Sequence, residues 1–297
     1  MKKTVNGKSS IYAILGDPIT HSMSPVLMNK NFELLDIDSV FLALRANLGD
    51  FEEIFTTLRK LEFAGYVFTM PVKEIALNFV DSLTKEAQII GAINCAVNKD
   101  GQLIGSNTDS IGFWRAIEQY NQNKIEIQKV FVLGCGGFSK SAITQAAIQG
   151  VKHIVVSSKF EEKQFMASFE KFRERLFSEF PDVHIDLIDW APEQWKSYLP
   201  DCDVIANGTP NGMGGKGDLH QIFPYDHVHQ NSMFFDAIYF PRETRFLEEA
   251  NKRGHICVEG LNLLVQQGAV SFNKYTGKEV DPSMMKEHIL NFWKENN

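Results

Sequence analysis

The first third of the chain alternates apolar runs of strand length with segments whose apolar residues recur at helical spacing. The apolar runs predict three buried strands, at residues 11–15, 40–44 and 66–69. The helical spacing predicts helices at 25–35 and 51–61, and Pro71 is expected to begin another whose first turn contains Lys73. Two further runs, 93–98 and 103–106, flank the turn sequence Lys99-Asp100-Gly101-Gln102, which predicts a β-hairpin.

A second alternating pattern starts at Gln128. It predicts a helix rich in small residues at 137–149 and strands at 129–133, 153–156, 185–188, 203–206 and 234–237. Strands separated by helices imply parallel βαβ units with right-handed crossovers. Residues 208–230 are rich in Gly, His, Asp and Asn, which is typical of a long mobile loop.

The bulk properties exclude several classes of protein. The 297 residues are enough for two domains, and the formal charge of −7 argues against a nucleic-acid partner. No apolar stretch has the length of a membrane span, and the basic N-terminus lacks the apolar core of a signal peptide. The four cysteines are scattered singly, and His227 and His229 lack further ligands, so we expect a cytoplasmic protein without a metal.

A glycine-rich loop joins the strand at 129–133 to the following helix. The loop reads Gly134-Cys135-Gly136-Gly137-Phe138-Ser139. Glycines at such a junction let the backbone approach a pyrophosphate, and the helix N-terminus offers free N–H groups. The order of strand, loop and helix therefore favours a dinucleotide site over an ordinary glycine-rich turn.

The next strand ends at Ser157-Ser158-Lys159-Phe160-Glu161, where the adenine ribose of a dinucleotide would lie. Lys159 is suited to the 2′-phosphate of NADP, whereas Glu161 could bind the ribose hydroxyls of NAD. The alternative, that both are solvated charges at a helix entry, stays open. The cofactor is accordingly NADP or NAD, with a lean to NADP.

Ser22 and Ser24 precede the first predicted helix, and Pro25 follows. Ser24 and Pro25 fit an N-cap and a first helical residue. Capping alone would explain Ser24, but two hydroxyls beside the positive end of a helix also suit a carboxylate ligand.

The chain resembles the shikimate dehydrogenases over nearly its whole length, through seven ordered motifs. These are Gly16-Asp17-Pro18-Ile19-Thr20-His21-Ser22-Met23-Ser24-Pro25, Thr69-Met70-Pro71-Val72-Lys73-Glu74, Gly91-Ala92-Ile93-Asn94, Asn107-Thr108-Asp109, Gly134-Cys135-Gly136-Gly137, Asn207-Gly208-Thr209-Pro210-Asn211-Gly212-Met213, and Asp236-Ala237-Ile238-Tyr239-Phe240-Pro241 with Gly260-Leu261 and Gln266-Gln267-Gly268-Ala269. The resemblance implies an α/β fold: a substrate-binding domain at 1–110, completed by 262–297 as C-terminal helices pack back on it, and a Rossmann domain at 111–261. The cleft between the domains would bring the nicotinamide to the substrate.

The resemblance also implies a catalytic pair, Lys73 and Asp109. Hydride delivery to a ketone leaves negative charge on oxygen, which a positioned lysine can meet with a proton while an aspartate orients the lysine and holds a substrate hydroxyl. Taken alone, Lys73 would be a surface charge and Asp109 a capping residue, because Asn-Thr-Asp before a helix is a good cap. Only the motifs favour catalysis.

The remaining implied roles follow from the same motifs. The carboxylate of the substrate would be bound by Ser22 and Ser24 with Tyr239 at that end of the cleft, and its ring hydroxyls by Thr69, Asn94 and Gln267. The cofactor would be held by Gly134, Gly136, Gly137, Phe138, Ser158, Lys159, Asn207, Thr209 and Gly260.

Three departures from the family pattern leave the substrate open. Val67 and Phe240 each stand where the family usually has an asparagine, and Asn262 with Leu263 replaces a common Gly-Met pair. Losing a hydrogen-bonding group beside a substrate hydroxyl changes discrimination greatly. The Thr-Met-Pro-Val-Lys run is nearer the quinate/shikimate dehydrogenase subgroup.

The expected activity is reversible reduction of 3-dehydroshikimate, or of 3-dehydroquinate, with NAD(P)H, in the chorismate pathway of aromatic amino acid biosynthesis. A dehydrogenase of a related cyclitol acid is an alternative, and a non-catalytic sensor that binds ligand and cofactor is another. A structural or interaction protein ranks lowest, because it leaves the glycine loop and the serine pair unexplained. A homodimer stays open.

Overall fold

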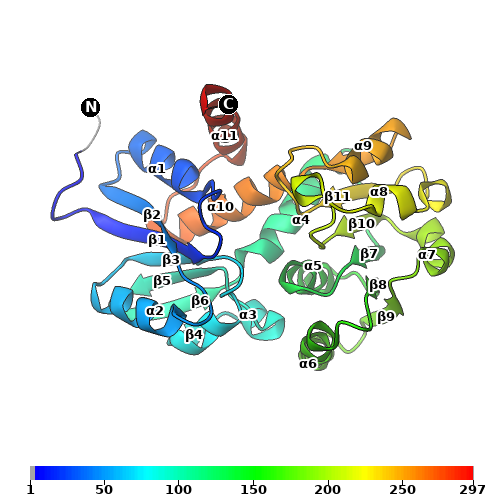
Figure 1. Cartoon of the computed structure of the whole chain (residues 1–297), viewed down its shortest axis with the longest axis horizontal. Coiled ribbons are helices and arrows are strands. Elements are labelled where there is room, and N and C mark those ends of the chain that lie inside the picture. Colours follow the sequence, from blue (N-terminus) through cyan, green and yellow to red (C-terminus); the bar gives the residue numbers. More distant parts are fainter. Residues whose placement is uncertain (1–3, 297) are drawn as a thin grey trace. The chain divides into compact units, whose positions relative to one another are not determined.

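The computed structural model describes residues 4–296, and the chain divides into two compact units. The first unit runs to Thr108 and resumes at Val265, and the second comprises Asp109–Leu264. Each unit is built on one six-stranded sheet with helices around it (Figure 1). This α/β architecture is the predicted fold class. Within residues 4–296, no helix combines the length and apolar character needed to cross a membrane.

The first unit begins with an alternation of strands and helices and ends with helices. Its elements are β1 (Ser10–Gly16), α1 (Ser24–Leu34), β2 (Ser39–Arg45), α2 (Phe51–Lys60), β3 (Gly65–Phe68), the 3-10 helix η1 (Ile75–Phe79), β4 (Ser82–Leu83), α3 (Lys85–Ile90), β5 (Cys95–Lys99), β6 (Gln102–Ser106), most of α10 (Gly260–Thr276) and α11 (Pro282–Asn296). The strand order is β2-β1-β3-β5-β6-β4. The predicted hairpin is β5–β6, in which Lys99 pairs with Gln102 across Asp100 and Gly101, both at positive φ.

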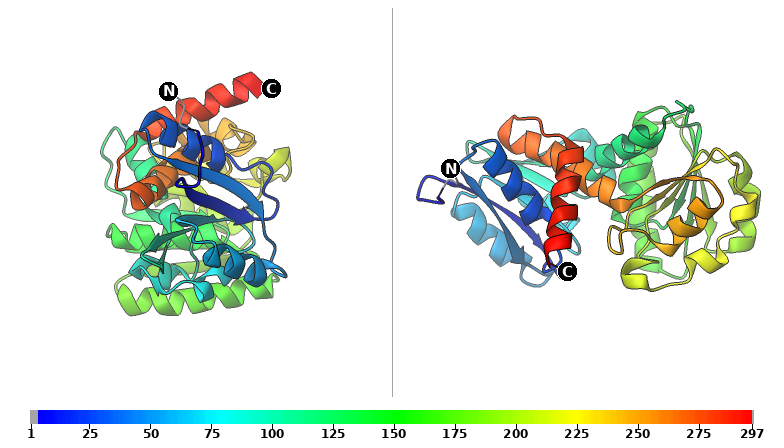
Figure 2. Two further views of the ribbon diagram at one scale, coloured as in Figure 1. Left: turned by 90° about the vertical axis from the view of Figure 1, so that its left-hand side faces the viewer. Right: turned by 90° about the horizontal axis from the view of Figure 1, so that it is seen from above.

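The C-terminal helices pack on the first unit, as predicted. The right-hand view of Figure 2 shows α11 lying alongside α1, and the two helices are in contact. On α10, the Phe272 ring lies 5.3 Å from Phe32, and the Tyr275 hydroxyl donates to the backbone oxygen of Tyr66 over 2.8 Å. These contacts fix the far end of the chain against the central strands of the sheet.

The second unit is a parallel sheet with helices between successive strands. Its elements are α4 (Thr108–Tyr120), β7 (Lys129–Leu133), α5 (Gly137–Ile148), β8 (His153–Ser158), α6 (Lys163–Glu179), β9 (His184–Asp189), α7 (Pro192–Tyr198), η2 (Leu199–Asp201), β10 (Val204–Asn207), η3 (Met213–Gly215), α8 (Leu219–Ile222), η4 (Tyr225–His227), β11 (Met233–Asp236), α9 (Arg245–Lys252) and β12 (Ile256–Val258). The strand order β12-β11-β10-β7-β8-β9 is that of a Rossmann fold, with β7 as the first strand of the pattern.

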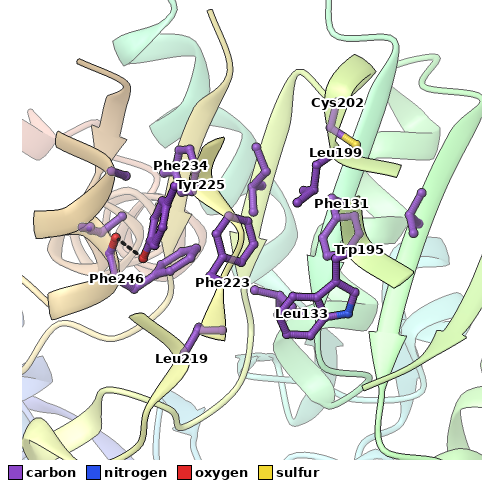
Figure 3. Packing of buried hydrophobic residues seen from close by; sticks show 14 of the residues in the cluster. Phe131, Leu133, Trp195, Leu199, Cys202, Leu219, Phe223, Tyr225, Phe234 and Phe246 are labelled. Atoms are coloured by element: carbon purple, nitrogen blue, oxygen red, sulfur yellow. Dashed lines mark hydrogen bonds between the residues drawn. The ribbon is translucent and has the colours of Figure 1, made fainter. Parts of the chain in front are cut away.

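The prediction of a long mobile loop at 208–230 is partly wrong. The segment contains three short helices, η3, α8 and η4, and it supplies Leu219, Phe223 and Tyr225 to the core of the second unit. In Figure 3 the Phe223 and Tyr225 rings lie beside Phe234, and their centroids are 5.7 and 5.8 Å from it. Burial of these apolar side chains outweighs the turn-forming residues between them.

Candidate active site

Four strand ends of the first unit share one edge of its sheet. Because β5 runs antiparallel to β3 and β6, the start of β5 lies with the carboxyl ends of β1, β3 and β6. The predicted residues Thr69 and Asn94 lie at this edge, directly after β3 and directly before β5. Ligands of open α/β sheets bind at the carboxyl ends of strands, so this edge is where a substrate is expected.

Gly16 lets the loops after β1 and β3 approach closely. A Cβ atom at Gly16 would collide with Cγ2 of Thr69 and would lie 2.7 Å from the carbonyl oxygen of Met70. The two loops are joined by Thr69 N–H, which donates to the oxygen of Leu15 over 2.9 Å, and by Asp17 N–H, which donates to Met70 over 3.0 Å. The contact holds the Thr69 segment against the loop that leads to the serine pair.

A buried polar network lies beside this edge and joins two of the predicted residues, Asn94 and Gln267. Oδ1 of Asn94 accepts from the N–H of Thr108 at 2.6 Å and from its hydroxyl at 3.1 Å. The Thr108 hydroxyl also lies 3.2 Å from Oε1 of Gln267 and 3.0 Å from the Ser271 hydroxyl. Nδ2 of Asn94 lies 3.5 Å from that Oε1. Asn94 is 2% exposed and Gln267 is 9% exposed. The hydrogen bonds of the network hold both side-chain amides in place.

Sequence reasoning assigned no role to Thr108 or Ser271, although both are fully buried in this network. A signal existed for Ser271, which stands four residues after Gln267 on α10 and therefore on the same face of that helix. Thr108 lies inside the Asn107-Thr108-Asp109 motif, in which the sequence alone points only to the aspartate.

Lys73 is half-buried in a turn that follows β3. Its carbonyl oxygen accepts from the N–H of Ile93 over 3.0 Å, so its backbone is joined to the residue preceding Asn94. The predicted helix from Pro71 is wrong: the chain forms a turn there, and only the short η1 follows. In an α-helix the Lys73 carbonyl would accept from the N–H four residues later. Here it accepts instead from Ile93, which is far away in the sequence.

Asp109 is the second residue of α4 and is 8% exposed. Thr108, its neighbour in the chain, is anchored by the buried network, so the backbone entering Asp109 is held at the first turn of the helix. A carboxylate at a helix N-terminus is stabilised by the helix dipole.

Ser24 begins α1 as its first helical residue, one position earlier than predicted. The residue before the helix is Met23, which makes no side-chain cap, so Ser24 is not the N-cap. Instead, the hydroxyl of Ser22 accepts from the N–H of Ser24 over 3.3 Å. The Ser24 hydroxyl thus lies in the first turn of an 11-residue helix and the Ser22 hydroxyl just before it, where free N–H groups favour an anion.

The glycine loop of the second unit has the geometry of a phosphate cradle. Gly134 follows β7 with φ +93°, a conformation that favours glycine, and Gly136 precedes the 12-residue helix α5. A Cβ atom at Gly136 or Gly137 would meet nothing within 4 Å, so the space over the helix N-terminus is open. Free N–H groups facing open space suit a pyrophosphate.

Other predicted cofactor residues are engaged with the protein itself. Asn207 is fully buried: its amide nitrogen donates to Asn211 and Asp236, and its oxygen accepts from the N–H and hydroxyl of Thr209 at 3.0 and 2.7 Å. A side chain at Gly260 would collide with the carbonyl of Ile238. These residues shape the loops after β10 and β11.

The end of β8 lies next to the glycine loop. Gly134 N–H donates to the oxygen of Ser157 over 2.8 Å, and the hydroxyl of Ser158 donates to Sγ of Cys135 over 3.0 Å. Lys159 is exposed beyond the strand end, and its Nζ lies 3.8 Å from Glu162. The Phe138 ring stacks on Phe235 at 5.5 Å, so it packs inside the unit.

Asp236 is a fully buried carboxylate that sequence reasoning did not single out. Burial raises its pKa to about 7, against three hydrogen bonds accepted from Asn207, Thr244 and the N–H of Ile238. Three residues farther along, burial also raises the pKa of Tyr239, which keeps that hydroxyl protonated and able to donate.

Comparison with known proteins gives concordant matches. Residues 14–96 match the family described as shikimate dehydrogenase substrate binding domain. A shikimate dehydrogenase (NADP(+)) of Lactococcus lactis subsp. cremoris is 36% identical over 93% of this chain and 95% of its own length, and one of Staphylococcus aureus is 33% identical over 94% and 97%. The crystal structure of a Listeria monocytogenes shikimate 5-dehydrogenase with shikimate and NAD superposes with a TM-score of 0.88, at 29% identity over 97% of this chain and 99% of that one.

Proposed function

This chain belongs to the shikimate dehydrogenase family, and on that premise we propose that it reversibly reduces 3-dehydroshikimate, or 3-dehydroquinate, with NAD(P)H. The observation that carries the proposal is the buried network of Asn94, Thr108 and Gln267 beside the strand ends of the first unit. It fixes two amides, and one of them, Asn94, directly follows Ile93, whose N–H is bonded to the Lys73 carbonyl. Amides can both donate to and accept from ring hydroxyls.

The proposed reaction adds a hydride to the ring carbonyl carbon, so the electrons of the C=O π bond move to oxygen. A nicotinamide cofactor supplies that hydride when bound. The ammonium of Lys73 donates a proton to the developing alkoxide, and solvent reprotonates the amine. Asp109 orients the ammonium and accepts from a neighbouring ring hydroxyl. Proton transfer of this kind accounts for about 10²–10⁴ in rate.

The substrate carboxylate would be bound by the hydroxyls of Ser22 and Ser24 at the first turn of α1. Tyr239 would donate to the same carboxylate, which its protonated hydroxyl permits. Thr69, Asn94 and Gln267 would hydrogen-bond the ring hydroxyls. Hydroxyl and amide groups of this kind match the polarity of a polyhydroxylated cyclic acid.

The cofactor would lie with its pyrophosphate over Gly136 and Gly137, where the N-terminus of α5 faces open space. We propose NADP as the preferred cofactor, because exposed Lys159 follows β8 at the position of the adenine ribose. The L. lactis and S. aureus relatives carry NADP(+) in their names, whereas the Listeria structure contains NAD. Exchange of Lys159 for Glu is expected to raise KM for NADP far more than KM for NAD.

Substrate choice is proposed to depend on Val67, which is 6% exposed on β3, two residues before Thr69. An isopropyl group there offers no hydrogen bond to a ring hydroxyl, whereas the asparagine that shikimate dehydrogenases usually have at this position would offer one. Val67→Asn is expected to improve kcat/KM for shikimate relative to quinate.

The test is a two-by-two assay of shikimate and quinate against NAD and NADP, followed by absorbance of the reduced cofactor. We expect turnover of at least one acid, faster with NADP. Tight binding of acid and cofactor without turnover of any member of a panel of cyclitol acids would contradict the enzyme and favour the sensor. The cytoplasmic location and a homodimer stay predictions.

A further inference from the structure

Two histidines and an aspartate form a cluster on β8 and β9, at the start of both strands. His153 Nε2 lies 2.7 Å from one carboxylate oxygen of Asp186, and His184 Nε2 lies 3.1 Å from the other. Each residue offers one atom that could bind a metal, and these three atoms lie within 4.8 Å of one another. Among the described residues 4–296, no other group of three or more His, Cys, Asp or Glu side chains has its ligand atoms this close together.

The register of the sheet produces this arrangement. His153 pairs with His184, and Val155 pairs with Asp186, in the parallel ladder of β8 and β9. Side chains two residues apart on a strand share a face, so all three polar groups project from the same side of the sheet. Val155 is fully buried, which leaves Asp186 shielded on the side toward the core.

The cluster is open to solvent on its other side. The side chains of His153, His184 and Asp186 are 40%, 70% and 27% exposed. On the neighbouring strand, Lys129 pairs with His153, but its Nζ lies 2.6 Å from Asp201, so this ammonium is already paired with a carboxylate. The ammonium of Lys129 therefore repels a dication at the cluster less than an unpaired lysine would.

We propose that His153, His184 and Asp186 bind one divalent transition-metal ion of the Zn²⁺ class. Two imidazoles and one carboxylate favour zinc, cobalt, nickel or copper over magnesium and calcium, which prefer oxygen ligands. Three protein ligands leave a position for water, as in open zinc sites. The ion would take the place of the hydrogen bonds that Asp186 shares with both rings, at ligand distances of about 2.0–2.2 Å.

This site would be separate from the proposed dehydrogenase site and does not rest on it. The cluster lies at the starts of β8 and β9, whereas the glycine loop and Ser158 lie at the opposite, carboxyl ends of the strands. Because β9 is the edge strand of the sheet, a bound ion would link that edge to the neighbouring strand (Figure 1). We therefore expect the metal to raise thermal stability without being needed for turnover.

The test uses full-length protein without a histidine tag, dialysed against chelator and titrated with Zn²⁺ and Co²⁺ by calorimetry. Wild-type protein is expected to bind one equivalent and to show a higher melting temperature with Zn²⁺. His153→Ala and His184→Ala should each lose that binding and that shift. His229→Ala, which removes an exposed histidine of the same unit, should retain both.

Circular dichroism and NAD(P)H turnover serve as folding controls for each variant. The visible spectrum of bound Co²⁺ gives a second measure that does not depend on stability, and it should disappear with either histidine. Absence of saturable binding by wild-type protein would overturn the proposal, and the cluster would then be a hydrogen-bonded link between strands. Undiminished binding by the His153→Ala/His184→Ala double variant would overturn it equally.

Discussion

Lys73 differs from the other lysines of the chain in its backbone hydrogen bonding, and not in the type of its side chain. Charged side chains are common in this protein, which contains 30 Lys and Arg and 37 Asp and Glu residues. Lys73 differs because its carbonyl is bonded to Ile93, directly before the amide of Asn94. A functional residue is thus distinguished by what fixes its position, since proton transfer demands hydrogen-bond reach.

Replacing Lys73 by Ala is expected to lower kcat by about 10²–10⁴, because the developing alkoxide then lacks its proton donor. Lys60→Ala, at the exposed end of α2, is the matched control and should leave kcat unchanged. Steady-state kinetics with the better acid and cofactor measure both. Equal rates for the two variants would remove Lys73 from the mechanism.

Asp236 is expected to make stability depend on pH. Its folded-state pKa is about 7, above the 3.8 of an unfolded chain, so the native state keeps a proton that the unfolded state has lost in this window. The free energy of unfolding should therefore fall as the pH rises from about 4 to about 7.

Asp236→Asn should abolish this contribution, because an amide does not titrate and fills the same volume. Urea unfolding at several pH values gives the measurement, with Asn at exposed Asp182 as the control. A wild-type profile parallel to that of Asp236→Asn would mean that the three accepted hydrogen bonds keep the carboxylate ionised throughout.

At the scale of elements, glycines in the second unit separate into two kinds. Gly136 and Gly137 face open space at the start of α5, whereas Gly260 at the start of α10 faces the backbone of Ile238. The first kind leaves room for a ligand, and the second leaves room for a neighbouring chain segment. Both were predicted as cofactor residues, and only their surroundings distinguish them.

Gly136→Ala should raise KM for the cofactor while the protein stays folded, because the new methyl group enters the space proposed for the pyrophosphate. Gly260→Ala should instead cost about 1–3 kcal/mol of stability through overpacking. Chemical denaturation and cofactor titration of the two variants give the comparison. A cofactor affinity unchanged in Gly136→Ala would argue against a pyrophosphate at that loop.

At the scale of the whole molecule, the chain enters the second unit once and returns. Two helices carry these crossings, α4 at Thr108–Asp109 and α10 at Leu264–Val265. Asn94 and Gln267 are 173 residues apart in sequence, yet they belong to one network because the returning helix joins the first unit. Substrate groups are thus proposed to come from both ends of the chain.

Hydrogen exchange should separate the two proposed ligand sites. NADP is expected to slow exchange around the glycine loop and the loop after β10, and shikimate to slow it around Thr69, Asn94 and the start of α1. Ligands protect the amides they order, since they bind the folded form alone. Mass spectrometry of peptic fragments gives the readout. Protection of the first unit by NADP alone would contradict the proposed division of roles.

The sequence alone predicted most strands, because apolar runs of four to six residues between turns identify buried strands. It predicted β7 with its bounds, the β5–β6 hairpin and the helix after the glycine loop. It misjudged the 208–230 segment, where scattered aromatic residues pack into the core among turn-forming neighbours. It also wrongly predicted a helix beginning at Pro71, where the chain forms a turn and the Lys73 carbonyl accepts a long-range hydrogen bond.

Local pattern and motif therefore determined the fold class, the family and the identity of the proposed site residues, since each depends on residues close together in the chain. The tertiary structure alone decided which of them share a network, which glycines face open space, and that His153 meets Asp186 across 33 residues. Strand register and the return of α10 bring distant residues together, and neither leaves a periodic trace in the sequence.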